Sequence, residues 1–319
     1  MTEEALEKVI PAEFAGFRLD QALAKMFPQF SRSRLKTWIL GGYVSVNGAS
    51  IRPKDSVMGG ETVILRPQAE KSVTSEPERI DLDIAFEDAA IIVVNKPAGL
   101  VVHPGAGNIH GTMMNGLLYR YPELAALPRA GIVHRLDKNT SGLLMVARTL
   151  TAHTVLVRAL AEREIGRHYE AVCCGTLTGG GMINGPIRRH PVDRLKMAVQ
   201  EGGKPAVTHY RLITRFAAHT HVSVKLETGR THQIRVHFAW RRHALVGDSV
   251  YGGRLAIPAG ASDELGKCLR EFRRQALCAT SLEFAHPETG EMVRVVAEPA
   301  PDFQALLATL GTDSKSPQQ

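Results

Sequence analysis

The stretch GIVHRLDKNTSGLLMVAR, residues 131–148, sets a block of charged and turn-forming residues between two short apolar runs. The second run, GLLMVAR, is short and almost entirely apolar, which predicts a buried β-strand. Asp137 stands in the block with cations on both sides, Arg135 and Lys138. Because Asp, Asn, Ser and Gly are favoured in turns, the residues alone leave two interpretations open. The block is either a turn in which Arg135 pairs with Asp137 or the site of a reactive carboxylate.

Further apolar runs on both sides of this block predict more strands, and periodic segments predict helices. We expect strands at AIIVVNK, HYEAVCCG, VTHYRLITRF and HVSVKLET. Apolar residues at helical spacing predict helices near residues 112–120, 151–164, 231–240 and 302–310. Strands and helices do not alternate regularly as in βαβ units, so the pattern predicts an α+β fold rather than a doubly wound one.

The first fifth of the chain has a different pattern. Leu19, Leu23 and Phe27 recur at helical spacing, and SRSRLKTWIL predicts a second helix with Ser31 as its N-cap. GGYVSVNG then predicts a glycine stop, a short strand and an Asn-Gly turn, and ETVILRP predicts a closing strand. These elements predict a small domain of its own.

A change of composition separates this domain from the rest. Residues 67–79, PQAEKSVTSEPER, combine two prolines with polar residues and lack an apolar period, which is typical of a linker. We therefore divide the chain into segments as follows: an N-terminal extension at 1–15, a small domain at 16–70, a linker at 71–79, a large domain at 80–310 and a disordered tail at 311–319.

Composition indicates an ordinary globular protein, with 44% hydrophobic and 22% charged residues in 319. The longest uninterrupted apolar stretch, Ala89 to Val94, is far shorter than the roughly 18 residues of a membrane span. The start, MTEEALEKVI, is acidic, unlike a secretory signal. We expect a cytoplasmic protein that does not act in a membrane.

Basic residues are concentrated in the small domain. The net charge of the chain is +7, and residues 16–71 contain nine Lys or Arg against four Asp or Glu. Arg32, Arg34 and Lys36 fall on the predicted second helix, where guanidinium and ammonium groups suit phosphate. A solvated helix face is the alternative interpretation of the same charges.

Several common kinds of site are poorly supported. The four cysteines form no C-x-x-C pair, and His232 and His237 are five residues apart, which does not put them on one helix face. No G-x-x-x-x-G-K-[ST] loop or G-x-S-x-G elbow occurs, and GAGNIHG at 105–111 does not fit a dinucleotide fingerprint. We therefore expect no metal and no nucleotide cofactor.

Two resemblances give these motifs a meaning. The segment RLDQALAKMFPQFSRSRLKTWILGGYVSVNG resembles the S4 RNA-binding domain, which implies that Arg32, Arg34 and Lys36 contact structured RNA. The segment GIVHRLDKNTSGLLMVA is similar to the catalytic motif of the RluA/RluD-type pseudouridine synthase family. Further matches to this family follow in order: NKPAGLVVHPG at 95–105, YEAVCCG at 169–175, LETGRTHQIRVH at 226–237 and LVGDSVYGG at 245–253. The resemblance implies a central mixed, mainly antiparallel sheet and an active-site cleft.

The family's reaction explains why one carboxylate suffices. The N1–C1′ bond of a uridine breaks and the base rejoins through C5, so no group is transferred and no cofactor is needed. One Asp either attacks C1′ or takes the 2′ proton. By resemblance this is Asp137, paired with Arg230. Tyr169 stacks on the target base, and Arg135 fills the place that the base leaves.

The resemblance also implies a substrate and leaves alternatives. It implies a monomer that acts on large-subunit (23S) ribosomal RNA or its assembly precursor, at the loop of helix 69. Another ribosomal or transfer RNA site is an alternative target. A non-catalytic ribosome-assembly factor on the same fold is the second hypothesis, and a hydrolase that releases free uracil is the third. Arg235 and Lys138 are set aside as phosphate contacts or structural ion-pair residues.

Overall fold

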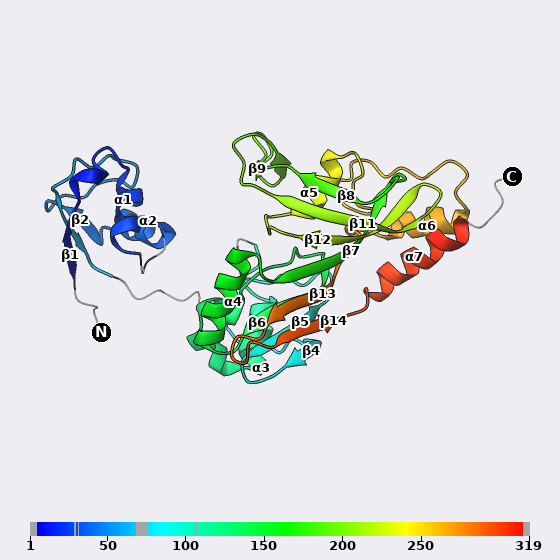
Figure 1. The fold of residues 1–319 in the computed structure, drawn as a ribbon, viewed down its shortest axis with the longest axis horizontal. Coiled ribbons are helices and arrows are strands. Elements are labelled where there is room, and N and C mark those ends of the chain that lie inside the picture. Colours follow the sequence, from blue (N-terminus) through cyan, green and yellow to red (C-terminus); the bar gives the residue numbers. More distant parts are fainter. Residues whose placement is uncertain (1–4, 29, 31, 68–75, 106, 315–319) are drawn as a thin grey trace. The chain divides into compact units, whose positions relative to one another are not determined.

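The protein is described by a computed structural model that covers residues 5–28, 30, 32–67, 76–105 and 107–314. The chain divides into two compact units, Met1–Thr74 and Ser75–Gln319, which are described separately (Figure 1). Among the described residues, no helix is both long and apolar enough to cross a membrane.

The first unit is a helix pair packed on a small sheet. Its elements are β1 (Leu6–Val9), η1 (Ala12–Phe14), α1 (Leu19–Met26), α2 (Arg32–Leu40), β2 (Val44–Val46) and β3 (Thr62–Leu65). The strands form an antiparallel sheet in the order β1-β3-β2. Leu19, Leu23 and Phe27 are completely buried, and Leu35 and Trp38 of α2 join the same core. The predicted helix pair and the two strands after it are confirmed.

Three expected boundaries differ from the structure. The expected extension contains β1, whose residues pair with β3, because Val9 and its neighbours supply the edge strand of the small sheet. Glu78, expected in the linker, belongs to the second unit, where its carboxylate accepts a hydrogen bond from Gly111 N–H. The last helix continues to Asp313, beyond the expected end at 310, because Leu310 is buried and keeps that turn packed. The expected N-cap Ser31, residues 68–75 and residues 315–319 lie outside the described residues.

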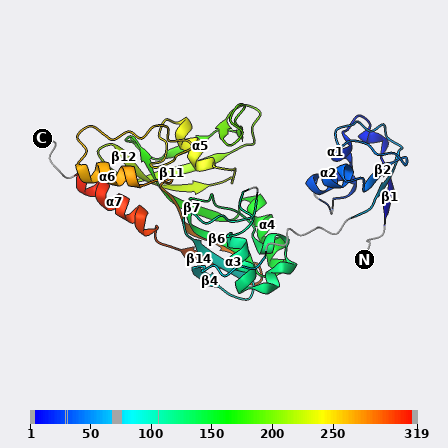
Figure 2. The same ribbon diagram turned by 180° about the vertical axis from the view of Figure 1, so that it is seen from behind.

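The second unit combines one large sheet with surrounding helices (Figure 2). Its strands are β4 (Ile84–Glu87), β5 (Ile91–Lys96), β6 (Ser141–Ala147), β7 (Gly166–Cys174), β8 (Gly181–Asn184), β9 (Ile187–Arg189), β10 (Met197–Val199), β11 (Val207–Arg215), β12 (His219–Leu226), β13 (Leu277–Ala285) and β14 (Met292–Val296). Its helices are α3 (Met113–Arg120), η2 (Pro122–Ala126), η3 (Pro128–Gly131), α4 (Leu150–Glu162), α5 (Gln233–Trp240), α6 (Asp263–Glu271) and α7 (Pro301–Asp313).

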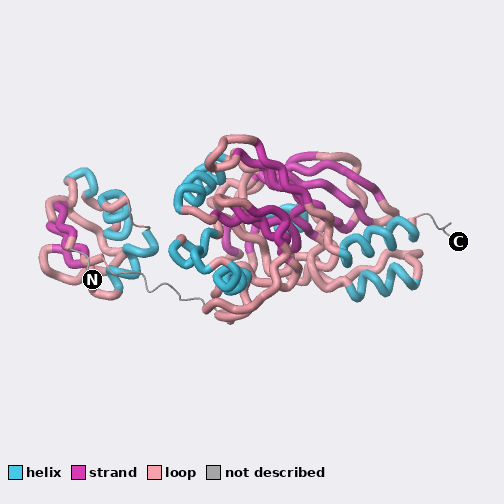
Figure 3. The backbone as a smooth tube through the Cα atoms, turned by 90° about the horizontal axis from the view of Figure 1, so that it is seen from below, coloured by secondary structure: helices cyan, strands magenta, loops and turns pink. Residues whose placement is uncertain are grey.

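The large sheet is mixed but mainly antiparallel, as expected. Its strand order is β4-β5-β6-β13-β7-β12-β11-β8, with β14 paired to β13, while β9 and β10 form a separate hairpin. The pairing of β6 with β13 is parallel, and the other pairings in this sheet are antiparallel. Figure 3 shows these strands in magenta with helices in cyan beside them. The α+β fold class is confirmed.

Strand β6 is central because its side chains are buried on both faces. Leu144 and Val146 point to one face, where they belong to the main core cluster together with Met113 and Leu117 of α3. Leu143 and Met145 point to the other face, where they pack against α4. This alternation follows from the two-residue period of a strand. It anchors the segment that comes directly before β6, the charged block with Asp137.

Some elements were expected and others were not. The five expected strands of this unit correspond to β5, β6, β7, β11 and β12, and the four expected helices to α3, α4, α5 and α7. The segment LCATSLEFA, which forms β13, and helix α6 were not expected from the sequence. β13 is buried over almost its whole length, but Thr280, Ser281 and Glu283 interrupt its apolar residues, so the segment is neither an apolar run nor a regular alternation.

Gly142 allows β6 to approach β13. Its φ is +105°, and a Cβ at this position would lie 2.1 Å from the Ala279 carbonyl oxygen.

We expect Gly142→Ala to lower the free energy of unfolding by about 3 kcal/mol or more, because the backbone strain and the clash with rigid backbone add. Gly290→Ala is the matched control, since Gly290 also has positive φ but open space around it. Urea unfolding of both variants checks this, and equal losses would contradict it.

Candidate active site

The charged block forms a turn that neighbouring segments hold in place. The Thr140 N–H donates to the Asp137 carbonyl at 3.1 Å, which closes the turn. The Thr140 hydroxyl accepts a hydrogen bond from the Gln275 amide at 2.9 Å. Both Thr140 and Gln275 are buried. The backbone around Asp137 is therefore fixed by the segment that leads into β13, far away in sequence.

Lys96, at the end of β5, holds the same turn from the other side. Its side chain is completely buried, and Nζ donates to the carbonyls of Pro97, Leu100 and Lys138 at 2.8 to 3.0 Å. Burial lowers the pKa of Lys96 to about 7, while the charge of Asp137 acts to raise it. Three carbonyl acceptors match the three donors of an ammonium group. Lys96 thus ties the chain next to Asp137 to strand β5.

The Asp137 carboxylate is paired with Arg235 on α5. Arg235 Nη1 donates to Asp137 Oδ2 at 2.9 Å. The same guanidinium makes a two-pronged contact with Asp248, from Nε at 2.7 Å and from Nη2 at 2.9 Å. The Asp248 side chain is 0% exposed and that of Arg235 is 6% exposed, whereas that of Asp137 is 17% exposed. Arg235 therefore joins a hidden carboxylate to an accessible one.

The pKa values of Asp248 and Arg235 follow from their surroundings. Burial acts to raise the pKa of Asp248, but hydrogen bonds from Arg235 and its charge leave the pKa below its usual value. Burial acts to lower the pKa of Arg235, but its bonds to Asp248 and the charges of both carboxylates raise it. Arg235 and Asp248 therefore form a charged pair, and the same guanidinium also contacts Asp137.

His232 and Tyr251 complete the surroundings of Asp137. His232 Nε2 lies 3.8 Å from Asp137 Oδ1, and its Nδ1 lies 2.7 Å from the Tyr251 hydroxyl. The Tyr251 ring also lies under the Arg235 guanidinium, 5.0 Å from its centre. Burial lowers the pKa of His232, although the charge of Asp137 acts against this. The imidazole therefore meets Asp137 mainly as a neutral neighbour.

The expected partner of Asp137 was wrong. Arg230 does not contact this carboxylate; its Nε donates to the Pro205 carbonyl at 3.1 Å. The reason is its place before the helix, because α5 begins at Gln233 and Arg230 lies in the turn that precedes it. Arg235 lies on the first turn of α5, from which it reaches both Asp137 and Asp248. The residue types alone do not distinguish Arg235 from Arg230 as the partner, because the choice depends on where α5 begins.

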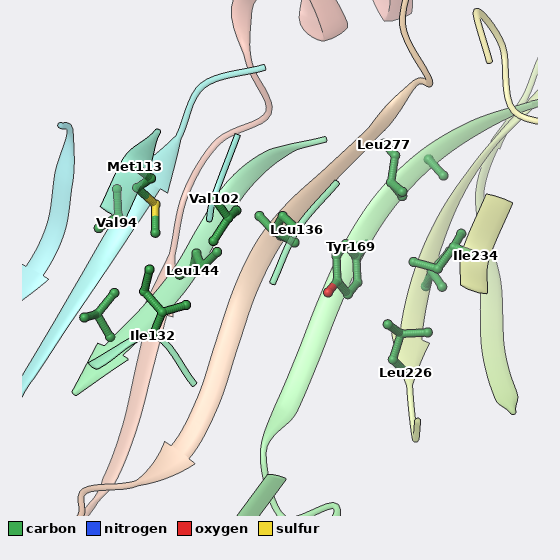
Figure 4. Close-up of a cluster of buried hydrophobic side chains, with 14 of the residues drawn as sticks. Val94, Val102, Met113, Ile132, Leu136, Leu144, Tyr169, Leu226, Ile234 and Leu277 are labelled. Atoms are coloured by element: carbon green, nitrogen blue, oxygen red, sulfur yellow. The ribbon is translucent and has the colours of Figure 1, made fainter. Parts of the chain in front are cut away.

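Tyr169 lies on β7, on the face of the sheet that carries the main core (Figure 4). Its side chain is 6% exposed and packs in the cluster with Leu136, Leu226 and Ile234. Burial raises the pKa of the phenol, and the charge of Asp137 acts in the same direction. Tyr169 is thus close enough to Asp137 for electrostatic interaction. Its suggested contact with a target base remains a prediction.

The residues directly before Asp137 have different surroundings. His134 Nε2 accepts a hydrogen bond from Met145 N–H of β6 at 3.0 Å, and burial lowers the pKa of this histidine to about 3. Arg135 is exposed, and Asp137 pairs with Arg235 instead of with this neighbour. The simple turn interpretation with an Arg135–Asp137 pair is therefore wrong. His134 fixes the block to β6, and Arg135 projects outward.

The three basic residues predicted to bind RNA lie on α2 of the first unit. Arg32 makes a two-pronged contact with the buried Asp20, at 3.0 and 2.7 Å, and half of its side chain stays exposed. The Arg34 guanidinium lies over the Trp38 ring at 4.8 Å. Lys36 is exposed. Asp20 therefore orients Arg32, and their contact with RNA remains a prediction.

In the described part of the chain, no group of three or more His, Cys, Asp or Glu residues is arranged to hold a metal ion. The cysteines that the structure describes are free thiols.

Comparison with known families defines the class of protein. The family model described as RNA pseudouridylate synthase matches residues 90–240, which include the turn with Asp137, strand β7 and helix α5. The S4 domain model matches residues 17–63, the first unit. A solved structure named human RNA pseudouridylate synthase domain containing 1 is 26% identical, with a TM-score of 0.56, over 76% of this chain and 90% of that chain. The protein is a pseudouridine synthase, an isomerase, that carries an S4 domain.

Several curated proteins resemble this chain over nearly its full length. A protein of Xanthomonas campestris pv. campestris is 53% identical over 97% of this chain and 93% of its own length. One of Pseudomonas aeruginosa is 52% identical over 99% of this chain and 98% of its own. One of Escherichia coli O6:H1 is 54% identical over 93% and 92%. All three are named ribosomal large subunit pseudouridine synthase D, and the chain belongs to their family.

Mutation of Arg235 and of Arg230 should lower the stability of the protein by different amounts. We expect Arg235→Gln to lower the free energy of unfolding by about 3–5 kcal/mol, because it leaves the buried Asp248 carboxylate without its cation. Arg230→Gln removes one hydrogen bond at a partly exposed site, so we expect a loss of about 1 kcal/mol or less. Urea unfolding of both variants measures the difference. A larger loss for Arg230→Gln would contradict the assignment of Arg235 as the pairing residue.

Proposed function

We propose that the protein converts uridine to pseudouridine in large-subunit ribosomal RNA, in the loop of helix 69, with Asp137 as the catalytic carboxylate. The observation that supports this role is the pairing of Asp137 with Arg235, which is itself held by the buried Asp248. The names of the curated relatives support ribosomal RNA as the substrate. We propose further that the protein works in the cytoplasm, as a monomer, without a cofactor.

The reaction requires one carboxylate in the protein and a site that shields the target nucleotide from water. The N1–C1′ bond breaks, the uracil turns, C5 bonds to C1′ and loses its proton, and the freed N1 takes up a proton, so the product has the same atoms as the substrate. Asp137 begins this either by attack on C1′ or by taking the 2′ proton. In both routes the carboxylate must be held in place, and the Arg235 hydrogen bond positions it.

The other residues have roles around this carboxylate. Tyr169 provides a packed aromatic surface beside Asp137, suited to stack on uracil that has left the RNA helix. The exposed guanidinium of Arg135 is planar and suited to occupy the vacated place in the RNA stack. Arg230 lies in the turn before α5, where its Nε donates to the Pro205 carbonyl, and its partly exposed guanidinium is suited to contact the RNA backbone. In the S4 unit, Arg32, Arg34 and Lys36 supply positive charge for the RNA stem.

The Asp137→Asn variant tests the reaction. We expect no pseudouridine in a helix 69 hairpin RNA, because an amide neither attacks C1′ nor accepts the proton, while folding and RNA affinity stay near those of the wild type. Digestion of the RNA to nucleosides followed by chromatography measures the product. Asp263→Asn, at an exposed position on α6, is the matched control and should retain full activity.

The same assay distinguishes the other functions. Unchanged pseudouridine from Asp137→Asn would contradict the proposed catalytic role. Absence of pseudouridine from the wild type, with binding intact, would favour a non-catalytic assembly factor, and free uracil would favour a hydrolase. Mapping of pseudouridine in ribosomal RNA from cells with and without the gene tests the target, which must lose its modification at helix 69 and not elsewhere.

A further inference from the structure

A second cation, Arg167 on β7, is buried beside the candidate active site. Its exposed fraction is only 8%. Its Nε is completely buried, and no hydrogen-bond partner for that atom exists among the described residues. No carboxylate in the described part of the chain lies within ion-pair distance of its guanidinium. A buried charge without a partner is costly, so a cation in this state suits an anion that arrives from outside.

The strand places Arg167 on the same face as Tyr169. The two residues are two positions apart, and side chains at this spacing point to one side of a sheet. The burial pattern of β7 agrees, because Arg167 and Tyr169 are buried while His168 between them is more exposed. Two residues of a strand span about 7 Å. This separation is comparable with the reach from base to phosphate within one nucleotide.

The turn before α5 leaves room for this guanidinium. A Cβ at Gly229 would lie only 2.5 Å from Arg167 Nη1, so a side chain at this position would displace the cation. The acid of that turn, Glu227, is engaged by Arg163 at 3.3 Å and by His209. Arg167 is also near the block with Asp137, because its charge acts on the pKa values of His134 and Tyr169. The cation therefore lies between Tyr169 and the turn before α5, with its charge uncompensated.

We propose that Arg167 binds a phosphate of the target nucleotide when the uridine enters the site, which rests on the function proposed above. A guanidinium matches the oxygens of a phosphate in a two-pronged contact, and the full negative charge compensates the buried cation. A uracil carbonyl offers one neutral acceptor and leaves the charge uncompensated. With the base on Tyr169 and the ribose at Asp137, the phosphate on Arg167 fixes the nucleotide at a third point.

A combination of protein and RNA changes tests this inference. The variants are Arg167→Gln and the matched control Arg158→Gln, which removes an exposed arginine on α4. The RNAs are the helix 69 hairpin and two versions with one neutral methylphosphonate linkage, either 5′ or 3′ of the target uridine. Dissociation constants at several salt concentrations and single-turnover rates of pseudouridine formation are measured for each pair.

We expect Arg167→Gln to weaken binding of the unmodified hairpin about tenfold. One of the two methylphosphonates should weaken wild-type binding to a similar extent and have no further effect on Arg167→Gln, because both changes remove the same contact. The slope of log affinity against log salt should fall by about 0.7 for Arg167→Gln and stay unchanged for Arg158→Gln.

Additive losses at both linkages, or unchanged affinity of Arg167→Gln, would overturn the inference. If Arg167→Gln does not fold, Arg167→Lys is tested in its place. Lysine keeps the positive charge but lacks the paired donors of the guanidinium. This variant should bind the hairpin with intermediate affinity and remain sensitive to the same methylphosphonate. A wild-type protein that forms no pseudouridine in the hairpin would instead contradict the proposed function. The two failures are thus distinguishable.

Discussion

The arrangement of the site depends on one guanidinium shared by two carboxylates. Arg235 contacts Asp137 and Asp248, which come from the turn before β6 and from the segment after α5. Asp248 is inaccessible to solvent and would be unstable as an anion without this cation. Asp248 accepts hydrogen bonds from Nε and Nη2 of the guanidinium, and this contact fixes the orientation of the group. The remaining nitrogen, Nη1, therefore points at Asp137. The buried Asp248 thus orients the partly exposed Asp137 carboxylate through Arg235.

The turn that carries Asp137 is equally constrained by its backbone. Lys96 holds the carbonyl after Asp137, Gln275 holds Thr140, and His134 is bound to β6. These contacts join segments on both sides of β6, whose apolar side chains fill both faces of the sheet. The fold therefore fixes the carboxylate before any RNA binds, which is what the catalytic role proposed for Asp137 requires.

Much of this arrangement follows from the sequence, and the exceptions have physical causes. The apolar runs around residues 91–96 and 141–147 predicted strands because their residues favour burial, and the turn residues between them marked the site. β13 escaped prediction because Thr280, Ser281 and Glu283 interrupt its apolar residues, so the segment forms no apolar run like that of β6. The partner of Asp137 was assigned to Arg230 rather than Arg235 because pairing over 98 residues depends on where α5 begins. Asp248 and Tyr251 stand in the matched segment LVGDSVYGG, but the sequence gave them no role, since their importance arises from contacts with Arg235.

A crystal structure of the Asp137→Asn variant bound to the helix 69 hairpin tests the central claim most directly. The account predicts a uridine turned out of the RNA stack, with its ribose against the side chain of residue 137 and with Arg235 still joined to Asp248. A target ribose that lies elsewhere, or Arg230 in the place of Arg235 beside residue 137, would contradict it.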